Sequence, residues 1–255
     1  MGKRVVFFVY GAVVYLLFLG TFLYAIAFVG GFAPTALDGS ATAPLTTALA
    51  IDLALLAIFA VQHSVMARPW FKRAWTRVVP PAIERSTYVL FATAALALIC
   101  WQWRPIGGTV WSVEEPIARV AIWAVFAFGW SQVLVMTFLI NHFDLFGLRQ
   151  VWLALIDEPY TPVVFATPAP YRIVRHPLYL GFLLAFWATP VMTAAHLVFA
   201  IATTAYIVLA IQFEEHDLAH EHGVAYLDYR RQVPMLLPFR RRAAVAPRDR
   251  TAVAR

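Results

Sequence analysis

The chain has 255 residues, of which only 13% are charged and 62% are hydrophobic, and its mean hydropathy is +0.71. A soluble domain carries about twice that share of charged residues and cannot bury this much apolar surface. Disordered chains are excluded as well, because they are poor in aliphatic and aromatic residues. The composition therefore indicates an integral membrane protein, and the length leaves room for one helical bundle.

The 20 Lys and Arg outnumber the 14 Asp and Glu, which gives a net charge of +6. In a membrane protein such an excess usually reflects topology, so we expect no nucleic-acid partner. The single cysteine, Cys100, lies in an apolar run and cannot form an intrachain disulfide or a thiolate metal cluster. We expect it to be a small, buried apolar side chain.

The apolar runs predict an all-α, polytopic bundle, because about 20 apolar residues in a helix cross a bilayer. The predicted spans, in chain order, are residues 5–29, 45–67, 86–103, 120–140, 178–192 and 196–213. The last two come from one uncharged stretch that would be nearly twice too long as a single helix. Pro190 divides it, so we expect a short helical hairpin. Residues 1–239 are expected to form one membrane domain, and the Arg-rich residues 240–255 a disordered tail.

The basic residues are distributed very unequally between the two sides of these spans. All Lys and Arg except Arg104 and Arg119 fall on one side. Loops that face the cytoplasm carry such an excess of basic residues. We therefore expect this side, with both chain ends, to face the cytoplasm.

The titratable side chains gather on the same side. Six histidines lie at or near the cytoplasmic helix ends: His63, His142, His176, His216, His220 and His222. Titratable groups that border one face of a membrane are candidates for chemistry. A pump or channel should spread polar groups through its spans, whereas here Asp52 is the one charged residue well inside a predicted span. Transport is not favoured, and Asp52 is expected to be a buried hydrogen-bonding partner.

His216 and His220 are four residues apart and share a helix face, as metal ligands do. The intervening Glu of the catalytic-zinc helix is absent, so we expect no metal site.

Two polar clusters flank the predicted hairpin. The first precedes and begins it: Tyr171, Arg172, Arg175, His176, Pro177, Tyr179, Leu180 and Gly181. The second follows it: Glu214, Glu215, Tyr226 and Tyr229. A proline suits the first turn of a helix, whose free N–H groups attract an anion. The hairpin brings both clusters to one surface, where they suit a zwitterionic, nucleotide-like cofactor.

The combined pattern resembles a known family. Residues 175–181 (Arg-His-Pro-x-Tyr-x-Gly), the hairpin, and residues 214–234 resemble the isoprenylcysteine carboxyl methyltransferase superfamily, which includes phospholipid methyltransferases. Four further blocks look like its bacterial methanethiol S-methyltransferase branch: residues 61–69, 80–88, 101–105 and 141–147. Together the blocks cover most of residues 60–238.

The resemblance implies transfer of a methyl group from S-adenosylmethionine (SAM) to methanethiol, giving dimethyl sulfide and S-adenosylhomocysteine, in a bacterial inner membrane. It implies that His176 and the backbone at 179–181 contact the methionine part of SAM, and that Arg172 or Arg175 neutralises its carboxylate. Glu214 and Glu215 should face the ribose, the amine or the sulfonium, which makes Glu215 a catalytic candidate. Tyr226 and Tyr229 are expected to close the pocket or stack.

One departure from the family bears on the acceptor. The isoprenylcysteine branch carries a catalytic Arg shortly before the Glu pair, where this chain has Ala210, Ile211 and Gln212. This argues against a prenylated, carboxylate-bearing acceptor. Methanethiol is small and partly apolar and can arrive through the lipid bilayer, whereas SAM must come from the cytosol.

Methyl transfer to a thiol needs alignment and a thiolate nucleophile. A simple alkyl thiol titrates well above neutral pH, so a base or an electrostatic environment is needed. His142 with Asp144, where the fourth span ends, is the first candidate, because a carboxylate can orient a histidine base. His63, in the last turns of the second span, is the second.

Two alternatives stay open at this point. The chain could methylate a lipid or another thiol, or it could be a non-catalytic membrane protein that keeps the fold. The complete motif at residues 214–234 favours an enzyme. The sequence gives no oligomeric state.

Overall fold

The computed structural model describes residues 1–162 and 167–239, so the predicted tail lies outside the described residues. The helices are α1 (Gly2–Val29), α2 (Leu45–Ala67), α3 (Pro69–Trp75), α4 (Pro81–Gln102), α5 (Pro116–Ile140), α6 (His142–Leu145), α7 (Leu148–Leu155), α8 (Pro177–Trp187), α9 (Ala194–His222) and α10 (Val224–Gln232). A short 3-10 helix, η1 (Ala169–Arg172), and two strands, β1 (Thr109–Ser112) and β2 (Val191–Thr193), complete the elements.

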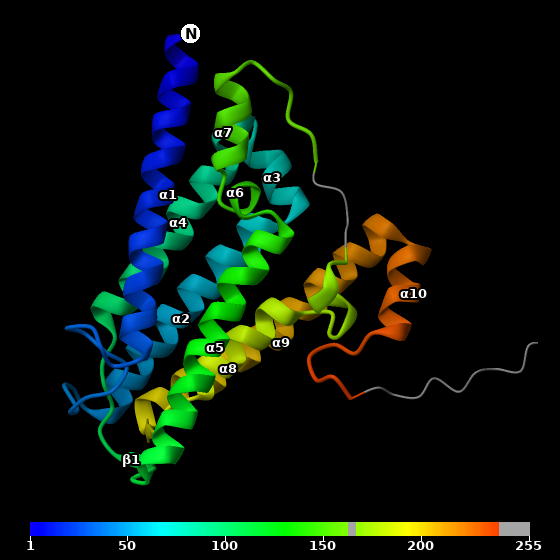
Figure 1. Ribbon diagram of the computed structural model, residues 1–255. Coiled ribbons are helices and arrows are strands. Elements are labelled where there is room, and N and C mark those ends of the chain that lie inside the picture. Colours follow the sequence, from blue (N-terminus) through cyan, green and yellow to red (C-terminus); the bar gives the residue numbers. More distant parts are fainter. Residues whose placement is uncertain (163–166, 240–255) are drawn as a thin grey trace, which may run out of the picture.

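The predicted all-α membrane bundle is confirmed. Among the described residues, five helices are long and apolar enough to cross a membrane: α1, α2, α4, α5 and α9. Helix α4 packs against α1 and α2, and α5 packs against α8. Figure 1 shows α8 and α9 running obliquely from the end of the molecule that carries β1 towards α10.

The predicted hairpin differs from the structure in the length of its arms. Helix α8 has 11 residues and ends at Trp187, so it is about 16 Å long and reaches roughly half way across a bilayer core. The predicted span 178–192 was therefore too long, because the chain leaves the helix before Pro190 and continues into β2. The second arm is longer than predicted, since α9 continues to His222.

The two strands were not predicted. They pair antiparallel, with Thr109 opposite Thr193 and Ser112 opposite Val191. The same end of the molecule holds His196, whose side chain is buried. One ring nitrogen lies 3.2 Å from the Asp38 carboxylate and the other 2.9 Å from the Phe186 carbonyl oxygen. These contacts tie the loop after α1 to the first turn of α9, and that turn to the last turn of α8.

The core contains many aromatic side chains, and edge-to-face contacts are frequent in it. The ring of Trp103 meets those of Phe28 and Phe199, and Trp130 meets Phe126. Two predictions about this region are confirmed. Asp52 is fully buried and accepts a hydrogen bond from the Arg104 backbone N–H at 2.9 Å, and Cys100 is buried.

A close approach of α5 and α8 positions the start of the hairpin. A Cβ at Gly129 would lie 2.7 Å from the Gly181 carbonyl oxygen and 2.7 Å from the Ala185 nitrogen. A Cβ at Gly181 would lie 2.9 Å from the Gly129 carbonyl oxygen. The side-chain amide of Gln132 also donates to the Pro177 carbonyl oxygen at 2.6 Å. Two glycines thus allow the two helix backbones to touch, which only small residues permit.

Candidate active site

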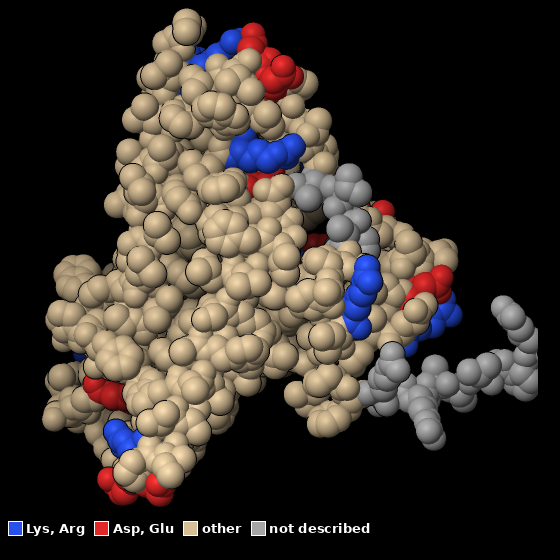
Figure 2. Space-filling model, viewed as in Figure 1, with Lys and Arg blue, Asp and Glu red and all other residues tan. Residues whose placement is uncertain are grey.

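The charged residues mark the ends of the molecule and the region of α10. Figure 2 shows Lys, Arg, Asp and Glu side chains at the end with α7, at the end with β1, and near α10, while the face between them is mostly uncharged. This distribution fits helices surrounded by lipid.

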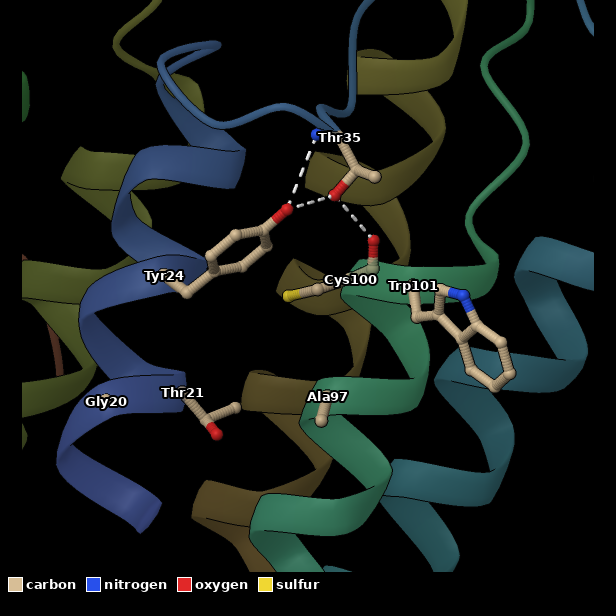
Figure 3. A pocket seen from close by; sticks show the side chains of 7 residues that line it. All are labelled: Gly20, Thr21, Tyr24, Thr35, Ala97, Cys100 and Trp101. Atoms are coloured by element: carbon tan, nitrogen blue, oxygen red, sulfur yellow. Dashed lines mark hydrogen bonds between the residues drawn. The ribbon is translucent and has the colours of Figure 1, made fainter. Parts of the chain in front are cut away.

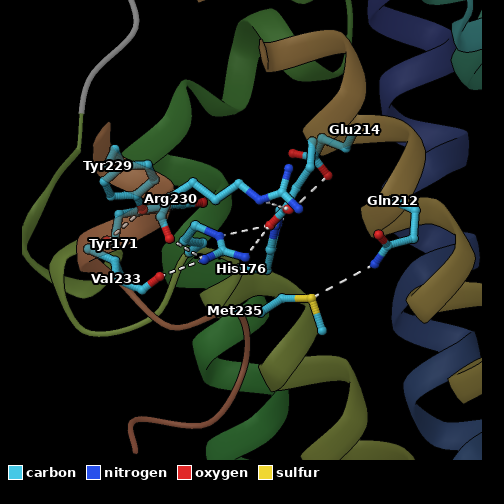
Figure 4. A network of polar contacts seen from close by, with 10 residues as sticks. Tyr171, His176, Gln212, Glu214, Tyr229, Arg230, Val233 and Met235 are labelled. Carbon is cyan, nitrogen blue, oxygen red and sulfur yellow. Dashed lines mark hydrogen bonds and ion pairs between the residues drawn. The ribbon is translucent and has the colours of Figure 1, made fainter. Parts of the chain in front are cut away.

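Glu215 is the buried centre of a cluster of basic side chains. Its side chain is 3% exposed, and one carboxylate oxygen accepts hydrogen bonds from Arg175 Nε at 2.7 Å and from His176 Nε2 at 3.1 Å. Arg230 Nε lies 3.2 Å from the other oxygen. A buried carboxylate is tolerated when charged donors surround it in this way. Figure 4 shows His176, which precedes α8, close to Glu214 of α9 and Arg230 of α10.

The segment after α10 completes the cluster. The Arg175 guanidinium donates to the carbonyl oxygens of Arg230 at 2.9 Å and Val233 at 2.6 Å. The backbone N–H groups of Arg175 and His176 donate to the carbonyl oxygens of Pro234 and Met235. The two polar clusters, which lie about forty residues apart in the sequence, are therefore held together by side-chain and backbone bonds alike.

The two adjacent glutamates differ in their surroundings. Glu214 is 43% exposed and lies 3.9 Å from His176 Nδ1, and its carboxylate accepts a hydrogen bond from the Tyr179 hydroxyl. Neighbouring residues on a helix point in different directions, so Glu215 faces inwards while Glu214 borders the solvent. Glu214 is thus the carboxylate that a ligand can reach.

Three tyrosines near the two glutamates stay protonated, namely Tyr171, Tyr226 and Tyr229. Burial raises the pKa of Tyr226 and of Tyr229 to about 12, with the nearby Glu215 carboxylate adding to the effect. Burial also raises the pKa of Tyr171. The Tyr229 hydroxyl donates to the Tyr171 carbonyl oxygen at 2.6 Å. These phenols therefore stay neutral, and Tyr229 serves as a hydrogen-bond donor.

Three of the predicted cofactor residues lie away from the cluster around Glu215. Arg172 is exposed, and its guanidinium donates to the Thr167 carbonyl oxygen at 3.4 Å. Gly181 packs against Gly129 of α5, as described above. Leu180 lines an apolar groove of about 490 Å³ between α5 and α8. His176 and Pro177 do begin α8, as predicted.

The predicted pairing of His142 with Asp144 is wrong. His142 Nδ1 lies 2.8 Å from the Thr137 hydroxyl, and His142 Nε2 lies 2.8 Å from the Tyr15 hydroxyl. Asp144 instead binds Arg149 at 3.0 Å and accepts from the Tyr160 hydroxyl at 3.3 Å. Residues two apart in a helical turn do not face each other, which separates the imidazole from the carboxylate.

His142 has the character of a buried structural histidine. The Thr137 hydroxyl donates to the Leu134 carbonyl oxygen, so it accepts from His142 Nδ1, and Nε2 accepts from Tyr15. The Phe138 ring stacks on the imidazole at 4.1 Å. Burial lowers the pKa of His142, which keeps the ring neutral. The second candidate base, His63, contacts the Tyr88 hydroxyl at 3.0 Å.

Arg230 was missed at the level of sequence. Its contact with Glu215 depends on α10 folding back along α9 after Gly223, whose positive φ of 55° makes the sharp turn. The signal that was available is its position directly after Tyr229 in the C-terminal motif.

An open cavity lies elsewhere. It has a volume of about 350 Å³ and is lined by residues between α1 and α4: Gly20, Thr21, Tyr24, Thr35, Ala97, Cys100 and Trp101. Figure 3 shows the Tyr24 hydroxyl and the Cys100 carbonyl oxygen both hydrogen-bonded to the Thr35 hydroxyl. None of these lining residues belongs to the polar clusters, so this cavity is separate from the candidate site.

The helical bundle and its cluster of two guanidinium groups and an imidazole around one buried carboxylate define a polytopic membrane protein that can hold a charged ligand. No protein-family model and no solved structure match the chain. It is 57% identical over 238 residues to methanethiol S-methyltransferase of Mycobacterium tuberculosis, covering 93% of this chain and 98% of that protein. It is also 57% identical over 231 residues to methanethiol S-methyltransferase of Crocosphaera subtropica, covering 90% and 91%. Mouse nurim is 29% identical over 185 residues, covering 69% of this chain and 70% of nurim.

The chain therefore belongs to the methanethiol S-methyltransferase family, within the isoprenylcysteine carboxyl methyltransferase superfamily, as its motifs predicted. It is an integral membrane methyltransferase, which confirms the enzyme among the predicted alternatives.

Proposed function

We propose that the protein transfers the methyl group of SAM to the sulfur of methanethiol, releasing dimethyl sulfide and S-adenosylhomocysteine. The observation that carries this proposal is the cluster around Glu215, in a chain whose relatives bear the name methanethiol S-methyltransferase. The cluster gathers opposite charges at one place, as a zwitterionic methyl donor requires.

The described residues fit SAM group by group. Arg230 is 48% exposed and offers a cation to the carboxylate of the cofactor, whereas the Arg175 guanidinium is committed to Glu215 and to two backbone carbonyls. Glu214 offers an exposed carboxylate to the amine or the ribose. Tyr171 and Tyr229 offer aromatic surface to the adenine, and the first turn of α8 offers N–H groups.

Bound SAM supplies an activated methyl group on a sulfonium. The residues of the chain then have two tasks, namely to align the acceptor with that methyl group and to remove the thiol proton. Glu215 contributes by holding Arg175, His176 and Arg230 in place, because its oxygens contact all three. One proton leaves the site with each turnover, since a neutral thiol and a sulfonium give two neutral thioethers.

We further propose that the site faces the cytoplasm of a bacterial inner membrane. Helices α3, α6 and α7 lie at the same end of the molecule as the N-terminus (Figure 1). Eight Lys and Arg lie at this end, against two, Arg104 and Arg119, at the end with β1, which supports a cytoplasmic orientation. A cytoplasmic site gives SAM access from the cytosol.

Binding of the cofactor product gives the first test. Detergent-purified protein should bind S-adenosylhomocysteine in a calorimetric titration, and the His176→Ala variant should lose this binding. A wild-type protein that folds normally but shows no heat of binding at any concentration would contradict the proposal. A protein that binds the cofactor but methylates only lipids or other thiols would still be a methyltransferase, but the assignment of methanethiol as its acceptor would be wrong.

A further inference from the structure

A second polar cluster lies next to the candidate cofactor site and contains residues from four helices. We call it the tyrosine cluster, and its members are Phe59, His63 and Ser64 of α2, Tyr88 of α4, Tyr179 of α8 and Tyr206 of α9. Tyr88 is buried and the others are half-buried. Among these residues only His63 and Tyr179 were candidates from the sequence.

Hydrogen bonds and ring contacts join the members of the cluster. The Tyr88 hydroxyl lies 3.0 Å from ring nitrogens of His63, and the Tyr206 hydroxyl lies 3.1 Å from Ser64 Oγ. The Phe59 ring stacks on His63 at 5.2 Å and meets Tyr206 edge to face at 6.4 Å. Phe59 therefore contacts both the His63 imidazole and the Tyr206 ring.

Tyr179 connects this cluster to the candidate cofactor site. Its ring lies 5.7 Å from the His176 ring, and its hydroxyl donates to Glu214. Tyr88 and Tyr206 lie within electrostatic range of Tyr179. Tyr179 therefore lies between the candidate cofactor site and the other tyrosines of the cluster.

Two cations flank the tyrosine cluster. The Arg85 guanidinium lies 4.8 Å from the centre of the Tyr88 ring. Arg68 Nε donates to the Ser64 carbonyl oxygen at 3.2 Å, and its charge is paired with Asp217 at 2.7 Å. Positive charge beside a thiol favours the thiolate, and aromatic rings make favourable contacts with sulfur. The surroundings suit a small, partly apolar thiol that must lose a proton.

We propose that the acceptor thiol binds against the tyrosine cluster, with its sulfur facing the Tyr88 and Tyr206 hydroxyls and its proton passing through Tyr88 to His63. This proposal rests on the proposed function. The S–H proton moves to the Tyr88 oxygen while the Tyr88 proton moves to a nitrogen of His63, so the phenol is restored. The electron pair on sulfur forms the new S–C bond, and the electrons of the broken sulfonium C–S bond stay with S-adenosylhomocysteine. His63 then releases one proton to solvent.

His63 is better placed for this task than His142. The ring nitrogens of His142 are both taken up by Thr137 and Tyr15, and neither of these residues contacts the candidate cofactor site. The partner of His63, Tyr88, by contrast lies within electrostatic range of Tyr179, whose ring lies 5.7 Å from the His176 ring. His63 contacts Tyr88 of α4 and Phe59 within α2, and Arg85 of α4 lies within electrostatic range of it.

The test compares two thiols of different acidity. Tyr88→Phe and His63→Asn should lower kcat/KM for methanethiol roughly 100-fold, the usual contribution of a positioned base. Affinity for S-adenosylhomocysteine should stay within about threefold of wild type, which also shows that the variants fold. With the more acidic 2,2,2-trifluoroethanethiol, the loss of kcat/KM relative to wild type should shrink by about tenfold or more. Removing the proton from a more acidic thiol contributes less to the activation barrier.

Tyr15→Phe is the matched control, because it removes a second tyrosine–histidine hydrogen bond that the described part of the chain contains. It should leave kcat/KM for both thiols close to wild type. Equal deficits with both thiols in Tyr88→Phe and His63→Asn, or no deficit, would overturn the assignment of this cluster. If the wild type itself gives no dimethyl sulfide, the proposed function fails instead. A variant that does not fold is replaced by Tyr206→Phe, which should raise KM for methanethiol and leave cofactor affinity unchanged, and an unchanged KM would count against the proposal.

Discussion

Arg175 and Glu215 form an ion pair in which the side chains are 10% and 3% exposed and the charged atoms lie 2.7 Å apart. Arg175 precedes α8, and Glu215 belongs to α9. The pair therefore fixes the start of one arm of the hairpin to the end of the other. It also orients His176 and Arg230, which contact the same carboxylate.

The Glu215→Gln variant should lose both stability and cofactor binding. An amide cannot balance Arg175 and Arg230, and removal of one partner from a buried ion pair costs about 3–5 kcal/mol. Thermal unfolding in detergent and titration with S-adenosylhomocysteine measure the two effects. Glu214→Gln is the control for stability, because Glu214 is 43% exposed and should change the unfolding temperature little. A Glu215→Gln protein as stable as wild type would show that the pair does not hold the hairpin.

The contact between α5 and α8 should not accept a side chain. In Gly129→Ala the new methyl would meet backbone atoms of Gly181 and Ala185 at 2.7 Å, and neither backbone atom can move freely. Overpacking of this kind costs about 1–3 kcal/mol, so the unfolding temperature should fall and turnover should fall with it. Gly20→Ala, also in a helix but with open space around the new Cβ, should be neutral. Equal unfolding temperatures for the two variants would contradict the packing described.

His142 should affect stability in a pH-dependent way. Burial lowers the pKa of its imidazole below the ordinary value of 6.5, so the unfolded chain binds the proton more readily than the folded protein. The wild type should therefore lose stability as the pH falls below 6.5, down to the lowered pKa of the folded state. His142→Asn should have a flatter profile, measured by thermal unfolding across this range. His216→Asn, whose side chain is 81% exposed, is the control and should follow the wild type. Parallel profiles for wild type and His142→Asn would contradict this reasoning.

Orientation in the membrane is testable with a reporter enzyme that is active only in the cytoplasm. Fused after residue 255, it should be active, because the basic residues gather on the side to which both chain ends are assigned. Fused into the loop between α4 and α5, which carries Arg104 and Glu114, it should be inactive. The opposite pattern would reverse the proposed topology and place the Glu215 cluster outside.

Much of the bundle could be predicted from the sequence, because a long uncharged run in a membrane protein has few alternatives to a helix. The buried positions of Asp52 and Cys100 followed from the same reasoning. The end of α8 could not be predicted, since it depends on β2 pairing with β1, about eighty residues earlier in the chain. Pro190 indicated a break in the hairpin but not the strand that follows it.

The candidate site was predicted in its composition but not in its contacts. The sequence placed Glu214 and Glu215 together, yet their different exposure depends on how α9 is turned towards Arg175. His142 and Asp144 were expected to pair because they are two residues apart in the sequence. In the folded protein His142 contacts Tyr15, and Asp144 pairs with Arg149. The tyrosine cluster joins residues of four helices, and such contacts leave no local signal in one sequence.

The central claim is methyl transfer from SAM to methanethiol, and the headspace above the reaction measures it most directly. Detergent-purified protein is mixed with SAM that carries an isotopically labelled methyl group and with unlabelled methanethiol, and the gas phase is examined by mass spectrometry. We expect dimethyl sulfide with one labelled methyl group, in an amount equal to the S-adenosylhomocysteine formed, and none from the Glu215→Gln protein. Absence of labelled dimethyl sulfide from a wild-type protein that binds S-adenosylhomocysteine would contradict the account.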